Sequence, residues 1–306
     1  MIPRLDHREP VSETVQHYVR ELHALGFEGE IHCDDATRTV LSTDNSIYQV
    51  YPQVVVFPKD HEDLCRIVRA AHDHEVTLYP RGGGTGTNAQ SLGAGVVVDT
   101  SKHMNQILEI NVEERWARVQ CGAVKDHLNA EIRQHGLFFA PNLSTSNRAT
   151  IGGMINTDAS GQGSVRYGKT RDHVLNLKAV LLTGETLETS VLSDDELDQL
   201  SRSTPEYRLG QALRELHDTN QQAIDDSFPK LNRCLTGYDL KHVRTDDGKI
   251  DLNAVLCGSE GTLALISEAR INLEPLPTEV ALVAVQYESF MDALFDAREL
   301  MTHGAT

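Results

Sequence analysis

Apolar and polar positions along the first hundred residues predict short strands separated by amphipathic helices. Residues 11–26 carry apolar side chains at helical spacing, with Ser12 as the candidate N-cap. The apolar run at 54–57 predicts a buried strand, and a helix with a regular apolar face follows over residues 60–74, with Asp60 as its cap. A further apolar strand at 76–79 would complete a β-α-β unit.

Beyond this unit the pattern predicts more strands than helices. The predicted strands lie at 95–99, 107–110, 116–121, 178–182, 186–189 and 271–273, and the predicted helices lie at 124–134 and near 209–220. Residues 44–51 form an irregular polar lead-in, and most of the stretch 191–252 is polar and acidic.

A boundary is predicted near the C-terminal end of the sequence. Pro275 and Pro277 interrupt the pattern. They are followed by a predicted strand at 281–287 and a predicted helix at 291–301. One strand and one helix cannot bury a core of their own. We therefore expect the chain to be a fragment of a longer protein.

The segment after the strand at 76–79 is exceptionally rich in glycine. Four of the five residues in Gly82–Gly86 are glycines, and Thr85, Thr87 and Asn88 add side-chain donors. Backbone without Cβ atoms can turn its N–H groups toward an anion and let it approach closely. The segment therefore predicts a phosphate or pyrophosphate site, with a plain glycine-rich turn as the alternative. It lacks the lysine of a P-loop, and it leads into a strand rather than opening a helix as in a Rossmann fold.

Two further segments strengthen the prediction of a ligand site. Residues 141–168 are dominated by hydroxyl, amide and glycine residues. Loops of this length in compact domains are usually functional or disordered, and the interspersed Ile151, Met154 and Val165 favour order. Residues 258–269 combine a glycine turn with an apolar strand.

In this order and at these separations, the three segments resemble the FAD-binding domain of the vanillyl-alcohol-oxidase / p-cresol-methylhydroxylase superfamily. The sequence GYDL at 237–240 is similar to the branch of D-lactate dehydrogenases, the glycolate oxidase flavin subunit and D-2-hydroxyglutarate dehydrogenases. The stretches 42–49, 81–88 and 147–164 resemble the N-terminal part of the large bacterial D-2-hydroxyglutarate dehydrogenases that contain FAD and iron–sulfur. The resemblance covers nearly all of the chain.

The resemblance implies an α+β fold, namely a two-subdomain FAD-binding domain of the p-cresol-methylhydroxylase type. It implies an N-terminal helix and lead-in at 1–50 and the FAD-binding domain at 51–277, with subdomains at about 51–112 and 113–277. Residues 278–306 would be the first strand and helix of a truncated substrate cap domain.

The resemblance also implies which residues hold the cofactor. The glycine loop would bind the FAD pyrophosphate by backbone N–H groups, residues 144–153 would line the phosphate and isoalloxazine side, residues 156–163 would close over the diphosphate and ribose, and Ile266 would lie at the adenine. The expected cofactor-binding residues are Pro80, Arg81, Gly82, Gly83, Gly84, Thr85, Gly86, Thr87, Asn88, Pro141, Ser144, Thr145, Ser146, Ala149, Thr150, Gly152, Gly153, Asn156, Asp158, Ala159, Ser160, Gly161, Gly163, Tyr167, Glu260 and Ile266. Relatives that attach flavin covalently use a histidine in the glycine loop. The stretch Gly82–Gly84 has none, so we expect non-covalent FAD.

The activity implied by the resemblance is oxidation of a D-2-hydroxy acid, with D-2-hydroxyglutarate favoured, by hydride transfer to flavin N5. Electrons would then pass to a downstream acceptor rather than directly to NAD. The catalytic base, the substrate-binding cations, an iron–sulfur cluster and a divalent metal are all expected beyond residue 306. Arg148 and Arg166 are the nearest candidate cations within the predicted site segments.

Composition narrows the possible partners. The net charge of −17 disfavours nucleic acid and anionic membrane surfaces as partners, and no apolar run approaches the ~20 residues of a membrane span. The N-terminus lacks the apolar core of a signal peptide. The five cysteines are widely spaced, which favours reduced thiols in the cytoplasm and disfavours a metal cluster in this stretch.

Other residues of the sequence suggest different functions. His127, Glu131 and His135 could share a helix face and bind a metal, but a solvated polar face is the favoured interpretation. A hydrolase is disfavoured because no Gly-x-Ser-x-Gly elbow is present. The alternatives that stay open are an FAD-binding module without turnover of its own, and an NADPH-dependent flavin reductase that shares the fold.

Overall fold

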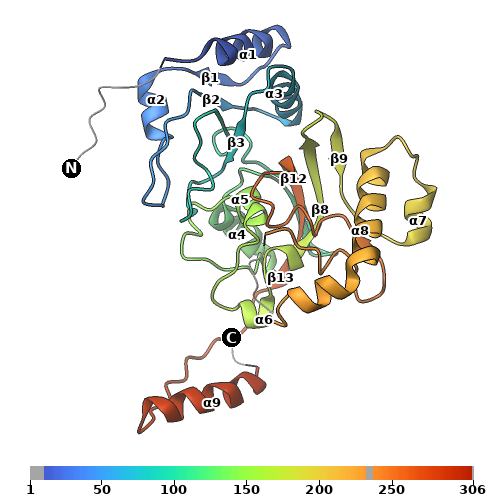
Figure 1. Ribbon diagram of the computed structural model, residues 1–306. Coiled ribbons are helices and arrows are strands. Elements are labelled where there is room, and N and C mark those ends of the chain that lie inside the picture. Colours follow the sequence, from blue (N-terminus) through green and yellow to red (C-terminus); the bar gives the residue numbers. More distant parts are fainter. Residues whose placement is uncertain (1–9, 232–236, 305–306) are drawn as a thin grey trace.

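The computed structural model describes residues 10–231 and 237–304, which fold mainly around two β-sheets (Figure 1). The smaller sheet contains β1 (Glu30–His32), β2 (Val54–Phe57), β3 (Leu78–Arg81) and β4 (Val96–Asp99) in the order β1-β2-β4-β3. Strands β2 and β3 both run parallel to β4, and β1 is antiparallel to β2. Strands β2 and β4 are fully buried, which agrees with their unbroken apolar sequences.

Three helices accompany this sheet: α1 (Glu13–Ala24), α2 (Asp35–Val40) and α3 (His61–Asp73). The predicted caps are confirmed, since the Val15 N–H donates to Ser12 and the Asp63 N–H donates to Asp60. Helices α1 and α3 pack against each other. The sequence pattern missed β1 and α2, which are too short to show a periodicity.

The larger sheet is antiparallel throughout. Its strands are β5 (Ile107–Asn111), β6 (Trp116–Gln120), β8 (Val174–Leu181), β9 (Thr186–Glu188) and β12 (Ala264–Asn272), in the order β5-β6-β12-β8-β9. The central strand β12 comes from the end of this domain's sequence and inserts between β6 and β8. Its first four residues are buried, and a β-bulge interrupts its pairing with β8 at Ser267.

Shorter elements connect the sheets and cover them. They are α4 (Lys125–Ile132), the 3₁₀ turn η1 (Arg133–His135), β7 (Leu137–Phe138), α5 (Ile151–Asn156), α6 (Ser164–Tyr167), the 3₁₀ turn η2 (Arg171–His173), β10 (Val191–Leu192), α7 (Asp194–Gln199), α8 (Pro205–Ser227), β11 (Ile250–Asp251) and β13 (Glu274–Pro275). Helices α5 and α6 lie in the segment that the sequence showed only as polar and glycine-rich. The order expected for that segment is confirmed, because α5 packs against β6 and β12.

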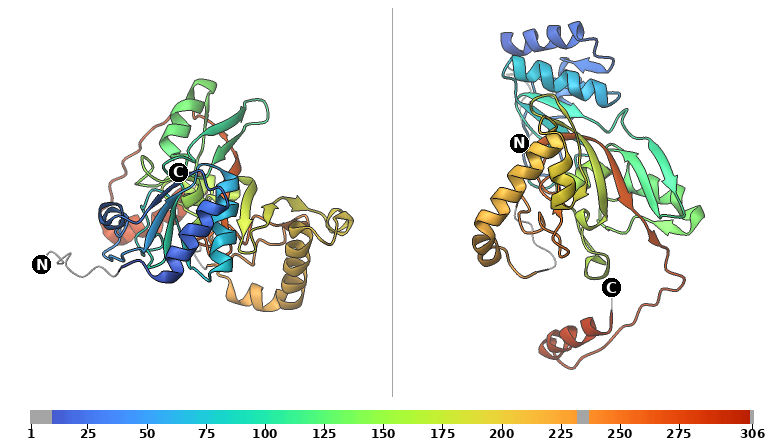
Figure 2. Two further views of the ribbon diagram at one scale, coloured as in Figure 1. Left: turned by 90° about the horizontal axis from the view of Figure 1, so that it is seen from above. Right: turned by 90° about the vertical axis from the view of Figure 1, so that its right-hand side faces the viewer.

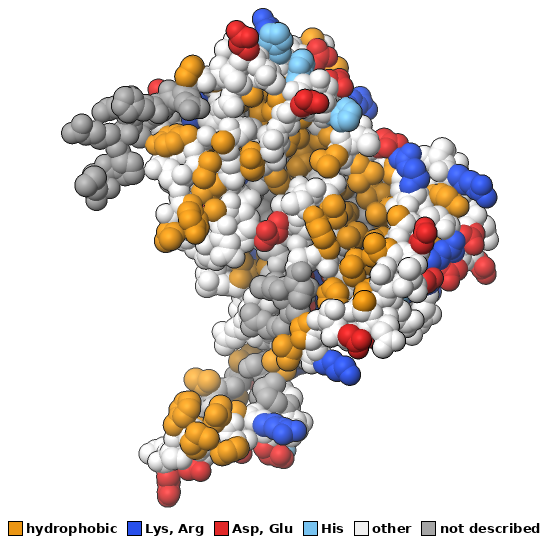
Figure 3. All heavy atoms as spheres, viewed as in Figure 1, with side chains coloured by type: hydrophobic (Ala, Val, Ile, Leu, Met, Phe, Trp, Pro, Cys, Tyr) orange, Lys and Arg blue, Asp and Glu red, His pale blue; other side chains and the backbone are white. Residues whose placement is uncertain are grey.

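The expected strand at 281–287 is wrong. These residues form no strand, and their apolar side chains are largely solvent-exposed, as in Leu282, which is 97% exposed. A strand needs a hydrogen-bonding partner, and no strand among the described residues pairs with this one. The following helix, α9 (Phe290–Thr302), is confirmed and lies apart from the sheets (Figure 2). Hydrophobic side chains cover much of its visible surface (Figure 3).

A buried polar cluster connects α3 to the larger sheet. His61 is 9% exposed, its Nδ1 lies 2.9 Å from the Ser267 hydroxyl, and its Nε2 lies 2.8 Å from the Thr186 hydroxyl. Because the Ser267 hydroxyl donates to the Lys178 carbonyl, the Nδ1–H of His61 must be the donor to Ser267. One imidazole therefore connects a helix beside the smaller sheet to two strands of the larger sheet.

We predict that the His61→Phe variant loses about 1–3 kcal/mol of folding free energy at pH 8, because two buried hydroxyl groups lose their partner. Burial lowers the pKa of His61 in the folded chain. Its contribution is therefore complete above the unfolded pKa of about 6.5 and is lost as the pH falls through the folded value. Urea unfolding at pH 8 and pH 5.5 should show a smaller loss on acidification for the variant than for the wild type. The exposed His127→Phe is the control, and an equal pH dependence in His61→Phe would contradict the assignment.

Candidate cofactor-binding cavity

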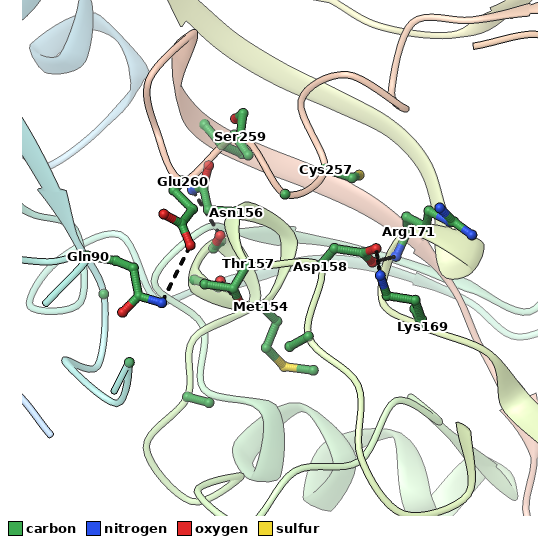
Figure 4. A pocket seen from close by; sticks show the side chains of 18 of the residues that line it. Gln90, Met154, Asn156, Thr157, Asp158, Lys169, Arg171, Cys257, Ser259 and Glu260 are labelled. Carbon is green, nitrogen blue, oxygen red and sulfur yellow. Dashed lines mark hydrogen bonds and ion pairs between the residues drawn. The ribbon is translucent and has the colours of Figure 1, made fainter. Parts of the chain in front are cut away.

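A cavity of about 750 Å³ lies where the two sheets meet. The glycine loop (residues 82–88) lines one side of it, and α5 with the residues around it lines another. The turn 257–262 and the first residues of β12 close the cavity from the larger sheet, and residues 237–242 complete the wall. All three segments singled out in the sequence thus converge on one space (Figure 4).

The glycine loop packs against residues 148–150 more closely than any side chain would allow. A Cβ on Gly82 would overlap the Thr150 hydroxyl, and a Cβ on Gly83 would overlap the Arg148 carbonyl. Gly84 has a φ of 61°, in the left-handed region that favours glycine. The glycines are therefore required by this close approach, and a plain surface turn does not explain them.

The backbone of this loop offers donors to a ligand. Within the described part of the chain, the N–H groups of residues 82–87 have no hydrogen-bond acceptor. Successive N–H groups in such a turn form a concave site that suits an anion. This arrangement fits the pyrophosphate expected from the sequence.

The turn before β12 adds a second close contact. Glu260 and Gly261 have φ angles of 52° and 77°, and a Cβ on Gly261 would overlap the Pro80 ring. The Gln90 amide donates to the Glu260 carboxylate over 3.4 Å, so the turn also connects to the end of the glycine loop (Figure 4).

Asn156 carries an acceptor that the protein leaves unused. Its Nδ2 donates to the Gly152 carbonyl over 3.0 Å, and the Glu260 N–H donates to its backbone carbonyl over 2.8 Å. Its Oδ1 is buried at the cavity wall, and no donor among the described residues reaches it. Buried polar atoms are normally paired, so this oxygen suits a hydroxyl or amino group of a ligand such as FAD.

Paired charges form one wall of the cavity. Lys169 and Asp158 form an ion pair with both side chains buried (Figure 4). Arg171 pairs with Asp239. Burial alone would raise the pKa of Asp239, but His242 and Arg171 lower it below its usual value.

His242 and the buried thiols offer little reactive chemistry. The Nδ1 of His242 lies 2.9 Å from the Asp239 carboxylate, and its Nε2 lies 3.3 Å from the Arg171 guanidinium. Both nitrogens of this imidazole are therefore engaged. Burial raises the pKa of Cys121 to about 12 and that of Cys257 well above its usual value, so both thiols stay protonated.

Most of the predicted cofactor-binding residues line this cavity, but a minority do not. The predicted residues outside it are Pro141, Ser144, Ser146, Gly161, Gly163 and Tyr167. Tyr167 packs edge-to-face on Phe138 instead. The expected nearest cations are also wrong, because Arg148 and Arg166 are exposed and do not line the cavity, whereas Lys169, Arg171 and Lys241 do.

The residues that the sequence did not indicate come from several separate places. They include Gln90, Ser91, Thr100, Leu143, Met154, Phe228, Pro229 and Leu231, together with Gly237, Tyr238, Asp239, Lys241, His242 and Cys257. The GYDL sequence was the available signal for 237–240, but a short sequence match indicates the family and does not show that its residues line a cavity.

Metal binding and membrane insertion find no structural support in the described residues. His127, Glu131 and His135 are all exposed. No group of His, Cys, Asp or Glu side chains within residues 10–231 and 237–304 could hold a metal ion. No helix in these same ranges is long and apolar enough to cross a bilayer.

Comparisons with known proteins show what this chain is similar to. A family described as FAD binding domain matches residues 52–190. D-2-hydroxyglutarate dehydrogenase of Pseudomonas putida KT2440 is 56% identical over 99% of this chain and 30% of its own length. The enzyme of the same name from Escherichia coli K12 is 50% identical over 97% of this chain and 30% of its own length. The chain thus spans about 30% of the length of these curated relatives.

Solved structures show the same fold at low sequence identity. An alkyldihydroxyacetonephosphate synthase superimposes with a TM-score of 0.67 and 21% identity, covering 97% of this chain and 51% of that protein. Identity at this level supports the fold alone.

We predict that Gly83→Ala weakens FAD binding at least about tenfold, because the added methyl group must push the glycine loop away from the Arg148 carbonyl. Fluorescence titration of the apoprotein with FAD measures this. Gly26→Ala is the control, because Gly26 has open space around it; unlike Gly83, it has a positive φ, of 76°. The control should lose some stability and keep its FAD affinity. Equal affinities for Gly83→Ala and wild type would show that the cofactor does not depend on this loop.

Proposed function

We propose that the chain belongs to the FAD-binding proteins of the vanillyl-alcohol-oxidase / p-cresol-methylhydroxylase superfamily and that the whole protein is a flavin-dependent D-2-hydroxyglutarate dehydrogenase. The observation that carries the proposal is the 56% identity to the Pseudomonas putida enzyme, which extends over nearly all of this chain. The cofactor is FAD, and this chain supplies the domain that binds it.

The described residues divide the binding of FAD between donors and acceptors. The unpartnered N–H groups of residues 82–87 would hold the pyrophosphate, and the Oδ1 of Asn156 would accept from a cofactor hydroxyl or amino group. Ile266, which lines the cavity at the start of β12, would pack against the adenine. When bound, FAD supplies the acceptor for the hydride that leaves C2 of the hydroxy acid.

The hydroxyl proton of the substrate must go to a base as the hydride leaves. His242 is a poor candidate, because Asp239 and Arg171 already occupy its two nitrogens. Lys169 and Arg171 are likewise paired with carboxylates. We therefore place the base and most carboxylate-binding cations in the part of the relatives that this chain does not cover. A separate electron acceptor would complete the turnover.

The domain boundaries and the location are part of the same proposal. The proposed boundaries place subdomains at about 51–112 and 113–277 and the start of a substrate cap domain at 278–306. The sheets follow these boundaries only in part, because β1 (Glu30–His32) joins the smaller sheet and β5 (Ile107–Asn111) joins the larger sheet. Cys33, Cys65, Cys121 and Cys257 form no disulfides with one another, which supports a reducing compartment, the cytoplasm.

We predict that acid precipitation of the FAD-loaded chain releases the flavin into the supernatant, because Gly82–Gly84 offers no side chain for a covalent bond. Absorbance of the supernatant and pellet measures this. Yellow colour that stays with the pellet would contradict the prediction.

Anaerobic addition of D-2-hydroxyglutarate to the FAD-loaded proteins tests the activity. The flavin of a protein as long as the relatives should bleach, whereas this chain alone should bleach at least about a hundredfold more slowly, since a positioned base contributes ~10²–10⁴-fold. Rapid bleaching of this chain by the substrate would place the base within it. Bleaching by NADPH instead of the hydroxy acid would favour a flavin reductase and overturn the proposal.

A further inference from the structure

We infer that Arg81 and Asp44 are positioning residues that hold the glycine loop in its binding conformation through the lead-in segment Thr43–Asn45. The inference rests on the assignment of this cavity to FAD. It gives a role to the Ser42–Gln49 stretch, which the cavity does not include. Arg81 lies directly before the glycine loop, so its positive charge suggests that it binds a phosphate of the cofactor.

The guanidinium of Arg81 is already occupied by protein groups. Its Nη2 donates to the Thr43 carbonyl over 2.8 Å, and its Nη1 donates to the Ser91 hydroxyl over 3.4 Å. Its Nε lies 3.8 Å from the Asp99 carboxylate. Each of the three nitrogens therefore faces a protein acceptor, and the side chain is only 10% exposed.

Asp44 closes this connection from the lead-in segment. The Ser91 hydroxyl donates to the Asp44 carboxylate over 3.1 Å, so Ser91 stands between Asp44 and Arg81. Asp44 also accepts from the Ser46 N–H over 2.8 Å, which fixes the local turn. The Asp44 carboxylate thus accepts hydrogen bonds from Ser46, in the segment before β2, and from Ser91, three residues beyond the glycine loop.

The lead-in segment contacts the glycine loop directly at its most constrained residue. The Asn45 N–H donates to the Gly84 carbonyl over 3.0 Å, and Gly84 is the residue of the loop with a positive φ. The space where Gly84 would carry a Cβ is filled by the Arg81 guanidinium. Arg81 and Asn45 thus hold the Gly84 peptide from two sides, which orients the N–H groups next to it.

The charges in this region favour a structural pair over a ligand contact. Burial lowers the pKa of Arg81, and the charges of Asp99 and Asp44 oppose that shift. Burial raises the pKa of Asp99, and the hydrogen bonds from Ser101 and the charge of Arg81 oppose it. A guanidinium that left Asp99 for a phosphate would leave a buried carboxylate without its cation. Ile47, in the same stretch, is 94% exposed and takes no part in this network.

The decisive variant is Asp44→Asn, because the two roles of Arg81 predict opposite results. If the segment positions the loop, removing the carboxylate weakens FAD binding by about tenfold, as expected for a hydrogen bond to a charged group. If Arg81 instead binds phosphate directly, removing a nearby negative charge leaves the affinity unchanged or increases it. Fluorescence titration of the apoprotein gives the dissociation constant, and the melting temperature of the apoprotein shows whether the fold itself has changed.

Arg81→Lys provides the second arm. A lysine keeps the charge but cannot face Thr43, Ser91 and Asp99 together, so we expect a loss of at least about tenfold and no further loss on adding Asp44→Asn. Full retention of affinity in Arg81→Lys would overturn the inference. Glu113→Gln controls for net charge, and Ile47→Ala controls for changes within the lead-in; neither should alter FAD affinity.

The outcomes separate this inference from the assignment of the cavity. A wild-type chain that fails to bind FAD would overturn the assignment of the cavity to FAD. A wild-type chain that binds FAD, together with an Asp44→Asn variant of equal or higher affinity, would leave the assignment intact and overturn the positioning role. An Asp44→Asn variant with a weaker affinity for FAD and an unchanged apoprotein melting temperature would support the positioning role.

Discussion

The cavity depends on the close approach of two stretches of backbone. Gly82 and Gly83 lie against Thr150 and the Arg148 carbonyl at separations that exclude a side chain. Within the described residues, the N–H groups of this loop form no backbone hydrogen bonds with the neighbouring segment. They can therefore donate to a ligand in the cavity. A loop with so little side-chain packing cannot hold its own shape, since glycine loses more conformational freedom on folding than any other residue. Its shape therefore has to be imposed by the residues around it.

The balance of charge explains why neutral donors suit this chain. The sequence carries a net charge of −17, which opposes the binding of a doubly charged pyrophosphate. The buried cations near the cavity do not compensate freely, because Lys169 is paired with Asp158 and Arg171 with Asp239. Such ion pairs fix the conformation of the cavity wall more than they attract an anionic ligand. Backbone N–H groups supply positive potential without adding further buried charges that would need partners.

The sequence predicted those features that arise from local pattern or from dense glycine, and missed those that depend on distant pairing. Helix α3 was predicted from the periodicity of its apolar residues, and Asp60 was predicted as its cap. Strand β2 was predicted from an unbroken apolar run. The pair Arg171–Asp239 joins residues 68 positions apart, and no local pattern reports such a contact. The strand expected at 281–287 failed for a related reason, because alternation shows which residues could form a strand and not whether a partner is present.

The place of β12 in the sequence has a consequence for the order in which the protein is made. This strand lies between β6 and β8, which are synthesised about 150 and 90 residues earlier. Until it emerges from the ribosome, both neighbours present unpaired edges that can pair with other chains. Residues 257–266 also close the cavity, so the cofactor site cannot be complete on a shorter nascent chain. Flavin therefore cannot be loaded before residues 257–266 have been made, and the edges of β6 and β8 stay open to pairing with other chains until residue 272 is exposed.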